Sequence, residues 1–99
     1  MEKPLFVMFI ERGKTYNKMT GAVVERHVQN LKNWDESGKI ALCGAFKGYP
    51  GIAGMVIFKT DTIEEADELC KLEPLVAEGF ATYKLRIFNA ANKDNNYLL

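Results

Sequence analysis

Two short apolar segments constrain the fold more than any other feature of the sequence. Residues 5–10 (Leu-Phe-Val-Met-Phe-Ile) and 54–58 (Gly-Met-Val-Ile-Phe) are rich in β-branched and aromatic residues, and neither segment alternates with polar residues. This composition favours β-strands, and the missing alternation indicates strands that are buried on both faces. A fold for this chain must therefore place these two strands in the middle of a sheet and cover both of their faces.

Residues 81–88 carry a different pattern, because apolar and polar side chains alternate along them. Such alternation is typical of an edge strand with one face on the core and one face in water. The side chains expected to face the core are Ala81, Tyr83, Leu85 and Ile87, and those expected to face water are Thr82, Lys84 and Arg86. Residues 40–45 predict a further short strand.

The first of two expected helices runs from about Ala22 to Glu36. Thr20 is a suitable N-terminal cap, and Gly38 suits a left-handed C-terminal cap. The apolar residues that recur at helical spacing, and that are expected on the buried side, are Val24, Val28, Leu31 and Trp34.

The second helix should begin after Thr62 and end before Glu73-Pro74, because a residue that precedes proline avoids helical geometry. Its expected buried side consists of Ile63, Ala66, Leu69 and Cys70. Residues 75–79 should form a short turn of helix or a loop.

The order strand, helix, strand, strand, helix, strand is the α+β, ferredoxin-like βαββαβ pattern. Right-handed crossovers then place both helices on one face of a four-stranded antiparallel sheet, with strands 5–10 and 54–58 in the middle. The other face, expected to carry Phe6, Met8 and Met55, is too apolar to face water on a small domain. We therefore predict a homodimer packed sheet on sheet, a dimeric α/β barrel. Residues 1–99 are expected to form a single domain, with about 89–99 as a C-terminal tail.

Charge and cysteine content exclude several classes of protein. Thirteen Lys and Arg balance thirteen Asp and Glu, so nucleic acid is not an expected partner. An RNA-recognition module shares the strand order but needs exposed aromatic residues with basic flanks. The apolar segments are too short to be a signal peptide or to span a membrane, so the cytoplasm is the expected location. One histidine with two scattered cysteines, Cys43 and Cys70, predicts no metal site, no cofactor and two reduced structural thiols.

His27 is the only histidine in the chain and lies at or beside the apolar stripe of the first helix. Histidine is the side chain whose unperturbed pKa, roughly 6.5, suits proton transfer near neutral pH. The alternative is a partly buried core histidine with hydrogen-bonded ring nitrogens. The topology brings the end of the first strand, the start of the first helix, the 44–54 hairpin and the Glu73-Pro74 corner to one rim. That rim is a suitable mouth for a small-ligand cleft.

Several of these positions together resemble the YciI-like (YCII-related) family of small proteins. The residues that carry the resemblance are His27, Leu31, Gly38, Gly44, Glu64-Glu65-Ala66, Glu73-Pro74 and Gly79. The resemblance implies a dimeric α/β barrel of ferredoxin-like units. It also implies an active site made of a histidine on the first helix and an aspartate in an Asp-Pro pair after the second. Characterised members include a dehydrochlorinase that acts on a chlorinated hydroquinone.

Carried onto this chain, the resemblance assigns the histidine to His27 and the carboxylate to Glu73. Glutamate keeps the charge of the family's aspartate but is one methylene longer. The family's Gly-Pro at the end of the second strand reads Gly44-Ala45 here. Positional errors near 1 Å can cost about 100-fold in rate, so the longer side chain is a significant departure.

The resemblance thus implies a small-molecule enzyme, lyase-, dehydrochlorinase- or hydrolase-like, that uses a His27–Glu73 acid/base pair. Arg12 would bind an anionic group of the substrate, Tyr49 would form a wall, and Gly44 would lie in the substrate site. The structural alternatives are an exposed strand-end charge for Arg12, a packed loop aromatic for Tyr49 and a solvated helix-end carboxylate for Glu73. The alternative function is a non-catalytic ligand-binding or regulatory dimerisation module with the same cleft.

Overall fold

A computed structural model of the chain describes residues 3–99 and confirms the predicted order of elements. The segment between the second helix and the last strand, expected as a short turn of helix or a loop, forms a short helix, and two 3-10 helices are added. The elements are β1 (Leu5–Arg12), the 3-10 helix η1 (Tyr16–Lys18), α1 (Gly21–Glu36), β2 (Ile40–Ala45), β3 (Ile52–Phe58), α2 (Ile63–Leu72), α3 (Pro74–Ala77), β4 (Ala81–Phe88) and the 3-10 helix η2 (Lys93–Leu98).

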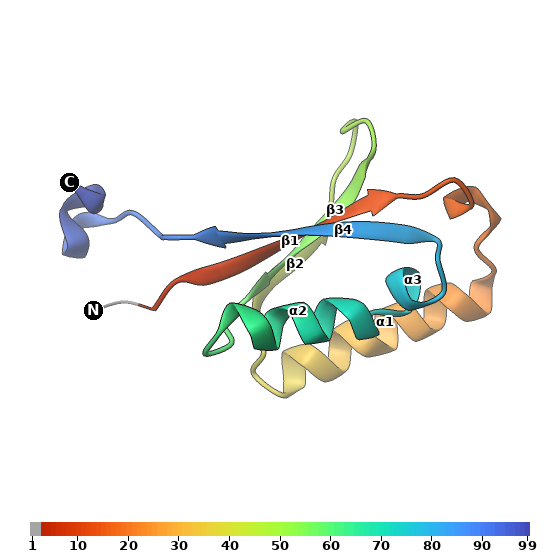
Figure 1. Cartoon of the computed structure of the whole chain (residues 1–99), viewed down its shortest axis with the longest axis horizontal. Helices are drawn as coiled ribbons and strands as arrows, with labels where there is room; N and C mark the ends of the chain where they lie inside the picture. The colour runs from red at the N-terminus through yellow and green to blue at the C-terminus, as the bar shows by residue number, and fades with distance from the viewer. Residues whose placement is uncertain (1–2) are drawn as a thin grey trace.

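The strands form one antiparallel sheet in the order β2-β3-β1-β4, so that β1 and β3 are the central strands, as the sequence predicts. The helices α1 and α2 both lie on one face of this sheet (Figure 1). The chain crosses over through α1 between β1 and β2 and through α2 between β3 and β4, with both helices on the same face of the sheet. This arrangement is the α+β ferredoxin-like fold.

Both central strands are longer than their apolar segments. β1 continues to Arg12 because Glu11 and Arg12 pair with Thr82 and Ala81 of β4. β3 begins at Ile52, and not at Gly54, for a similar reason: Ile52 pairs with Glu11. Backbone hydrogen bonds hold these ends in the sheet whatever the polarity of the side chains, so hydrophobicity alone underestimates their length.

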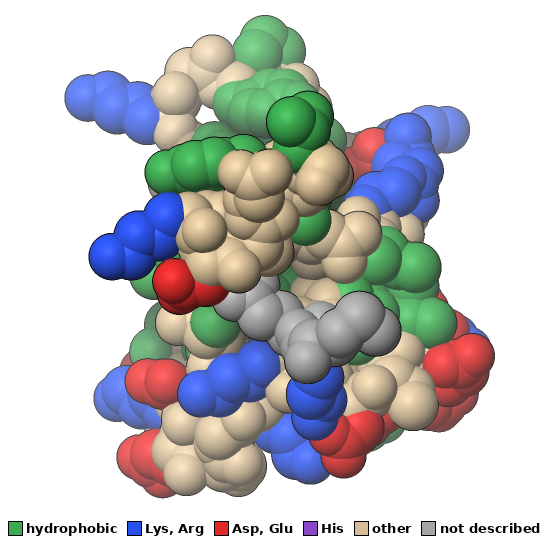
Figure 2. All heavy atoms as spheres, turned by 90° about the vertical axis from the view of Figure 1, so that its left-hand side faces the viewer, with side chains coloured by type: hydrophobic (Ala, Val, Ile, Leu, Met, Phe, Trp, Pro, Cys, Tyr) green, Lys and Arg blue, Asp and Glu red, His purple; other side chains and the backbone are tan. Residues whose placement is uncertain are grey.

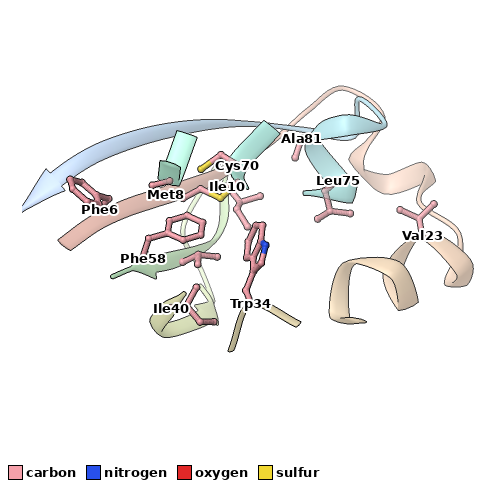
Figure 3. Packing of buried hydrophobic residues seen from close by; sticks show 12 residues of the cluster. Phe6, Met8, Ile10, Val23, Trp34, Ile40, Phe58, Cys70, Leu75 and Ala81 are labelled. Atoms are coloured by element: carbon pink, nitrogen blue, oxygen red, sulfur yellow. The ribbon is translucent and has the colours of Figure 1, made fainter. Parts of the chain in front are cut away.

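Phe6 and Met8 of β1 point toward the helices, which corrects their expected place on the open face. They pack in a core with Phe58 of β3 and Trp34 of α1, whose rings meet edge to face at 5.2 Å between centroids (Figure 3). Because β1 is apolar on both sides, its hydrophobicity does not reveal which set of alternate residues faces which way.

The open face of the sheet carries the other alternate residues. Strand register places Val7 and Phe9 of β1 on this face beside Ile57 and Met55 of β3. Leu42 of β2 joins them beside Ile57 and is 61% exposed. Figure 2 shows hydrophobic side chains gathered in the upper part of the end that carries both termini. Val7 is buried, whereas Phe9, Met55 and Ile57 are partly exposed.

The buried side of α1 also differs from its expected stripe. Val23 and Trp34 are buried, whereas Val24 and Val28 are 43% and 42% exposed. The helix is therefore rotated so that Val23 and His27 turn toward the sheet. Periodicity predicted the helix correctly but not its buried side. One apolar stripe contains Val24 and Val28, the neighbouring one contains Val23, and the stripe with Val23 is the one that packs together with Trp34.

The predicted helix ends are confirmed. The Thr20 hydroxyl accepts the Val23 N–H at 3.4 Å, and the Thr62 hydroxyl accepts the Glu65 N–H at 3.1 Å. Gly38 has a positive φ of 72° after α1, and α2 ends at Leu72.

The C-terminal tail extends beyond β4, and its last residues, Tyr97, Leu98 and Leu99, are exposed. Within residues 3–99, no helix is long and apolar enough to cross a membrane.

Candidate functional site

Glu73 occupies the junction between α2 and α3 and is fully buried, with 0% of its surface exposed. Its Oε2 accepts the backbone N–H groups of Leu75 at 2.8 Å and Val76 at 3.3 Å. Both donors belong to the first turn of α3, and the Val76 N–H is shared with the Glu73 carbonyl oxygen at 3.0 Å. Backbone donors at a helix start stabilise a carboxylate away from water. The structural alternative of a solvated helix-end carboxylate is therefore wrong for Glu73.

The second oxygen of Glu73, Oε1, faces α1 and lies in hydrogen-bond contact with Nδ1 of His27. An ionised carboxylate can only accept, so it pairs with the ring form that carries its proton on Nδ1, and the neutral ring of that form has its lone pair on Nε2. The His27 side chain is 21% exposed, between the buried carboxylate and an open space. The pair that the sequence predicts is thus assembled, with one nitrogen held and the other available.

A second ion pair links the same two parts of the chain. Arg26, next to His27, binds Glu78 just after α3 through a two-pronged contact, with Nη2 at 2.7 Å from Oε1 and 2.8 Å from Oε2. The hydrogen bond and the charge of Glu78 raise the pKa of Arg26 above its usual value. Two adjacent contacts therefore fix α1 against the α3 corner and limit the freedom of His27.

His27 lies in the wall of a cavity of about 210 Å³ between α1, η1, α3 and the sheet. Most of the wall is apolar, and His27 and Tyr16 provide its main polar side chains. The lining consists of Ile10, Tyr16, His27, Leu31, Cys43, Gly44, Ala45, Ala53, Gly54, Met55, Val56 and Leu75. Concave, mostly apolar sites with a few polar groups are typical of small-ligand sites.

Two glycines shape the β2–β3 wall of this cavity. A Cβ on Gly54 would lie 2.4 Å from the carbonyl oxygen of Gly44, so only glycine permits the close approach of the two strands there. A Cβ on Gly44 would meet nothing within 4 Å. The structure places Gly44 in the cavity wall, and its role in substrate binding stays a prediction.

Arg12 and Tyr49 lie outside the cavity lining, at the same rim. Arg12 Nη1 donates a hydrogen bond to the Tyr49 carbonyl oxygen at 3.3 Å, and the Tyr49 ring packs on Phe46 at 5.1 Å between centroids. The Arg12 guanidinium lies 5.4 Å from the ring centroid of Tyr16. Tyr16, which the sequence analysis did not single out, is therefore the residue that connects Arg12 to the cavity. The one available signal was an aromatic residue in an otherwise polar loop.

Both cysteines are free thiols. Cys43 is half-buried in the cavity wall, whereas Cys70 is buried in the core, where burial raises its pKa to about 12. Across residues 3–99, no three His, Cys, Asp or Glu side chains lie close enough to hold a metal ion together.

The fold and the site define an α+β ferredoxin-like protein with a histidine–carboxylate pair at a small cavity. No family model and no curated protein matches the sequence. The fold is similar to that of a 5-chloro-2-hydroxyhydroquinone dehydrochlorinase from Burkholderia phenoliruptrix AC1100, whose structure was solved in complex with 2,5-dihydroxybenzoquinone. The TM-score is 0.65 at 13% sequence identity, over 93% of this chain and 99% of that enzyme. At this identity the likeness establishes the fold.

Proposed function

We propose that this protein is an enzyme that performs acid–base catalysis on a small organic molecule, with His27 as the proton-transferring group. The observation that carries the proposal is the contact between His27 Nδ1 and the buried Glu73 carboxylate at the wall of the cavity. Groups arranged in this way typically contribute ~10²–10⁴-fold to a rate.

In the proposed reaction, Nε2 of His27 accepts a proton from the substrate. The electron pair left by that proton forms a new π bond as the bond to the leaving group breaks and the leaving group departs with its own pair. Glu73 holds the ring in the required tautomer and stabilises the imidazolium that forms. The imidazolium then returns its proton to the solvent or to the product. This sequence describes a lyase, of which dehydrochlorination is one case.

The cavity suits a substrate the size of one six-membered ring. Its volume is about 210 Å³, and an apolar cavity of about 150 Å³ is enough to bind benzene in another protein. The ligand of the structurally similar dehydrochlorinase, 2,5-dihydroxybenzoquinone, has this size and shape. These observations support an oxygenated ring compound as the substrate class.

A homodimer formed through the open face of the sheet is part of the proposal. A second copy would cover the exposed Leu42 and the partly exposed Phe9, Met55 and Ile57, which register places on that face beside the already buried Val7. Sheet-on-sheet packing would bury these side chains at a spacing of about 10 Å.

The alternative is a binding module that holds the same class of ligand without turnover. The mostly apolar wall favours it, because binding needs shape and desolvation, whereas turnover also needs a working His27. Chloride release from chlorinated hydroquinones separates the two functions. We expect release by the wild type, loss of release in His27→Gln, and no change in Glu25→Gln, an exposed change on the same helix. Ligand binding that survives in His27→Gln, with no chloride release by the wild type, would support the binding module instead.

A further inference from the structure

Tyr16 is the polar side chain that shares the cavity with His27 but comes from a different part of the chain. It opens η1, in the loop between β1 and α1, and its half-buried ring lines the cavity. Among residues 3–99, no hydrogen bond involves its hydroxyl group. A phenol hydroxyl can both donate and accept a hydrogen bond, so this hydroxyl is free to bind a polar group of a ligand in the cavity.

The backbone around Tyr16 is fixed to a distant turn. The Gly13 N–H donates to the Phe80 carbonyl oxygen at 3.0 Å, and the Thr15 hydroxyl donates to the Gly79 carbonyl oxygen at 3.5 Å. A Cβ on Gly13 would lie 2.8 Å from the Phe80 oxygen, so glycine is needed for this approach. The loop therefore presents Tyr16 from a defined position.

The ring of Tyr16 is held in turn by Arg12. The Arg12 guanidinium lies 5.4 Å from the ring centroid, and its Nη1 is bound to the Tyr49 carbonyl oxygen at 3.3 Å. A planar guanidinium placed on an aromatic ring is attracted to it electrostatically. Arg12 is thus fixed between the β2–β3 hairpin and the Tyr16 ring.

We propose that Tyr16 contacts the substrate, and that Arg12 is a positioning residue that keeps the Tyr16 ring in the cavity wall. The hydroxyl of Tyr16 binds one oxygen of the substrate while His27 acts at another. The preferred substrate is therefore a single ring that carries oxygen at two positions. This inference rests on the proposed function, because it assigns the substrate to the cavity beside His27.

The test is a titration of the protein with 2,5-dihydroxybenzoquinone, in which NMR chemical-shift changes of the protein measure binding. Tyr16→Phe should weaken binding about fivefold, the value of one ordinary hydrogen bond. Tyr97→Phe, the same change at an exposed tyrosine of the C-terminal tail, should leave the affinity unchanged. Equal affinities of the wild type and Tyr16→Phe would overturn the contact. Failure of the wild type to bind would overturn the substrate class.

The role of Arg12 is tested by combining changes. Arg12→Met should weaken binding in the wild type and have no further effect in Tyr16→Phe, because it acts through that hydroxyl. Independent, additive losses would overturn the positioning role. Loss of affinity in Tyr16→Phe together with unchanged chloride release in His27→Gln would support Tyr16 as a contact and contradict the proposed function of His27, so the two proposals can fail separately.

Discussion

His27 and Glu73 are 46 residues apart in the sequence and in hydrogen-bond contact in the fold. One oxygen of Glu73 holds the histidine and the other caps α3, so a single buried side chain joins three elements. From the α2–α3 junction the glutamate side chain is long enough to make both contacts.

Glu73→Asp is therefore expected to break one of the two contacts. The shorter side chain leaves either His27 or the α3 N–H groups without a partner, which lowers the free energy of unfolding by ~1–3 kcal/mol. Denaturant unfolding measures this loss. Glu78→Asp, which shortens a partly exposed carboxylate nearby, is the matched control and should cost less. Unchanged stability in Glu73→Asp would show that the length of the side chain has no structural role.

The β2–β3 wall offers a matched pair of glycine changes. Gly54→Ala forces a Cβ against the Gly44 carbonyl oxygen and should destabilise the protein by ~1–3 kcal/mol. Gly44→Ala meets open space and should leave the stability within about 0.5 kcal/mol of the wild type. Thermal unfolding of the two variants side by side tests the close approach. Similar stability of both would contradict it.

The Tyr83–Asp67 hydrogen bond predicts how stability depends on pH. This bond is the main cause that lowers the pKa of Asp67 below 3.8, and it raises the pKa of Tyr83 to about 12. A carboxyl group whose pKa is lowered in the folded state stabilises the fold at pH values above its unfolded-state pKa. This stabilisation is lost as the pH falls through the folded-state pKa. A tyrosine whose pKa is raised in the folded state stabilises the fold below about pH 10, and this stabilisation is lost as the pH rises toward the folded-state pKa.

Tyr83→Phe removes both effects. We expect the variant to be less stable than the wild type by about 0.5–1 kcal/mol between about pH 5 and 9, a small value because Asp67 is partly exposed. The difference should shrink below about pH 4 and above about pH 10. Unfolding free energies across this range provide the measurement. A difference that stays constant at both extremes would rule out Asp67 as the partner of Tyr83.

The proposed homodimer makes a separate prediction. Leu42→Lys places a charge on the open face of the sheet, at a side chain that is already 61% exposed in one copy of the chain. It should therefore convert a dimer into a folded monomer in analytical ultracentrifugation. Leu72→Lys, at an exposed position on α2, should remain dimeric. A monomeric wild type would exclude the dimer.

The order of elements, and the gathering of His27 and Glu73 at one rim, could be predicted from the sequence, because the handedness of crossovers leaves few topologies for a βαββαβ chain. The pairing of the two residues was implied by the family resemblance. The sequence did not predict which side of β1 and which side of α1 face the core. Phe6 and Met8 lie on a strand that is apolar on both sides, and Val24 competes with Val23 for the buried side of α1. In both cases the choice depends on packing between distant elements, which hydrophobic periodicity does not contain.

Within the site, Tyr16 was missed because contacts distant in sequence set its place. The loop that carries it is held by Gly13 against Phe80, and its ring lies beside Arg12. Arg12 and Tyr49 were correctly expected at the rim but do not line the cavity. Their predicted contact with the substrate is therefore replaced by the proposed action of Arg12 through Tyr16.

The central claim is that Glu73 fixes His27 in the form that can accept a proton at Nε2. The most direct test is the ¹⁵N NMR spectrum of the His27 ring, which needs no assignment because the chain has one histidine. In the neutral ring we predict a proton on Nδ1 and an unprotonated Nε2, with this preference weakened in Glu73→Gln. In the wild type, a neutral ring with its proton on Nε2 would contradict the claim, because the nitrogen facing Glu73 would then carry no proton to donate.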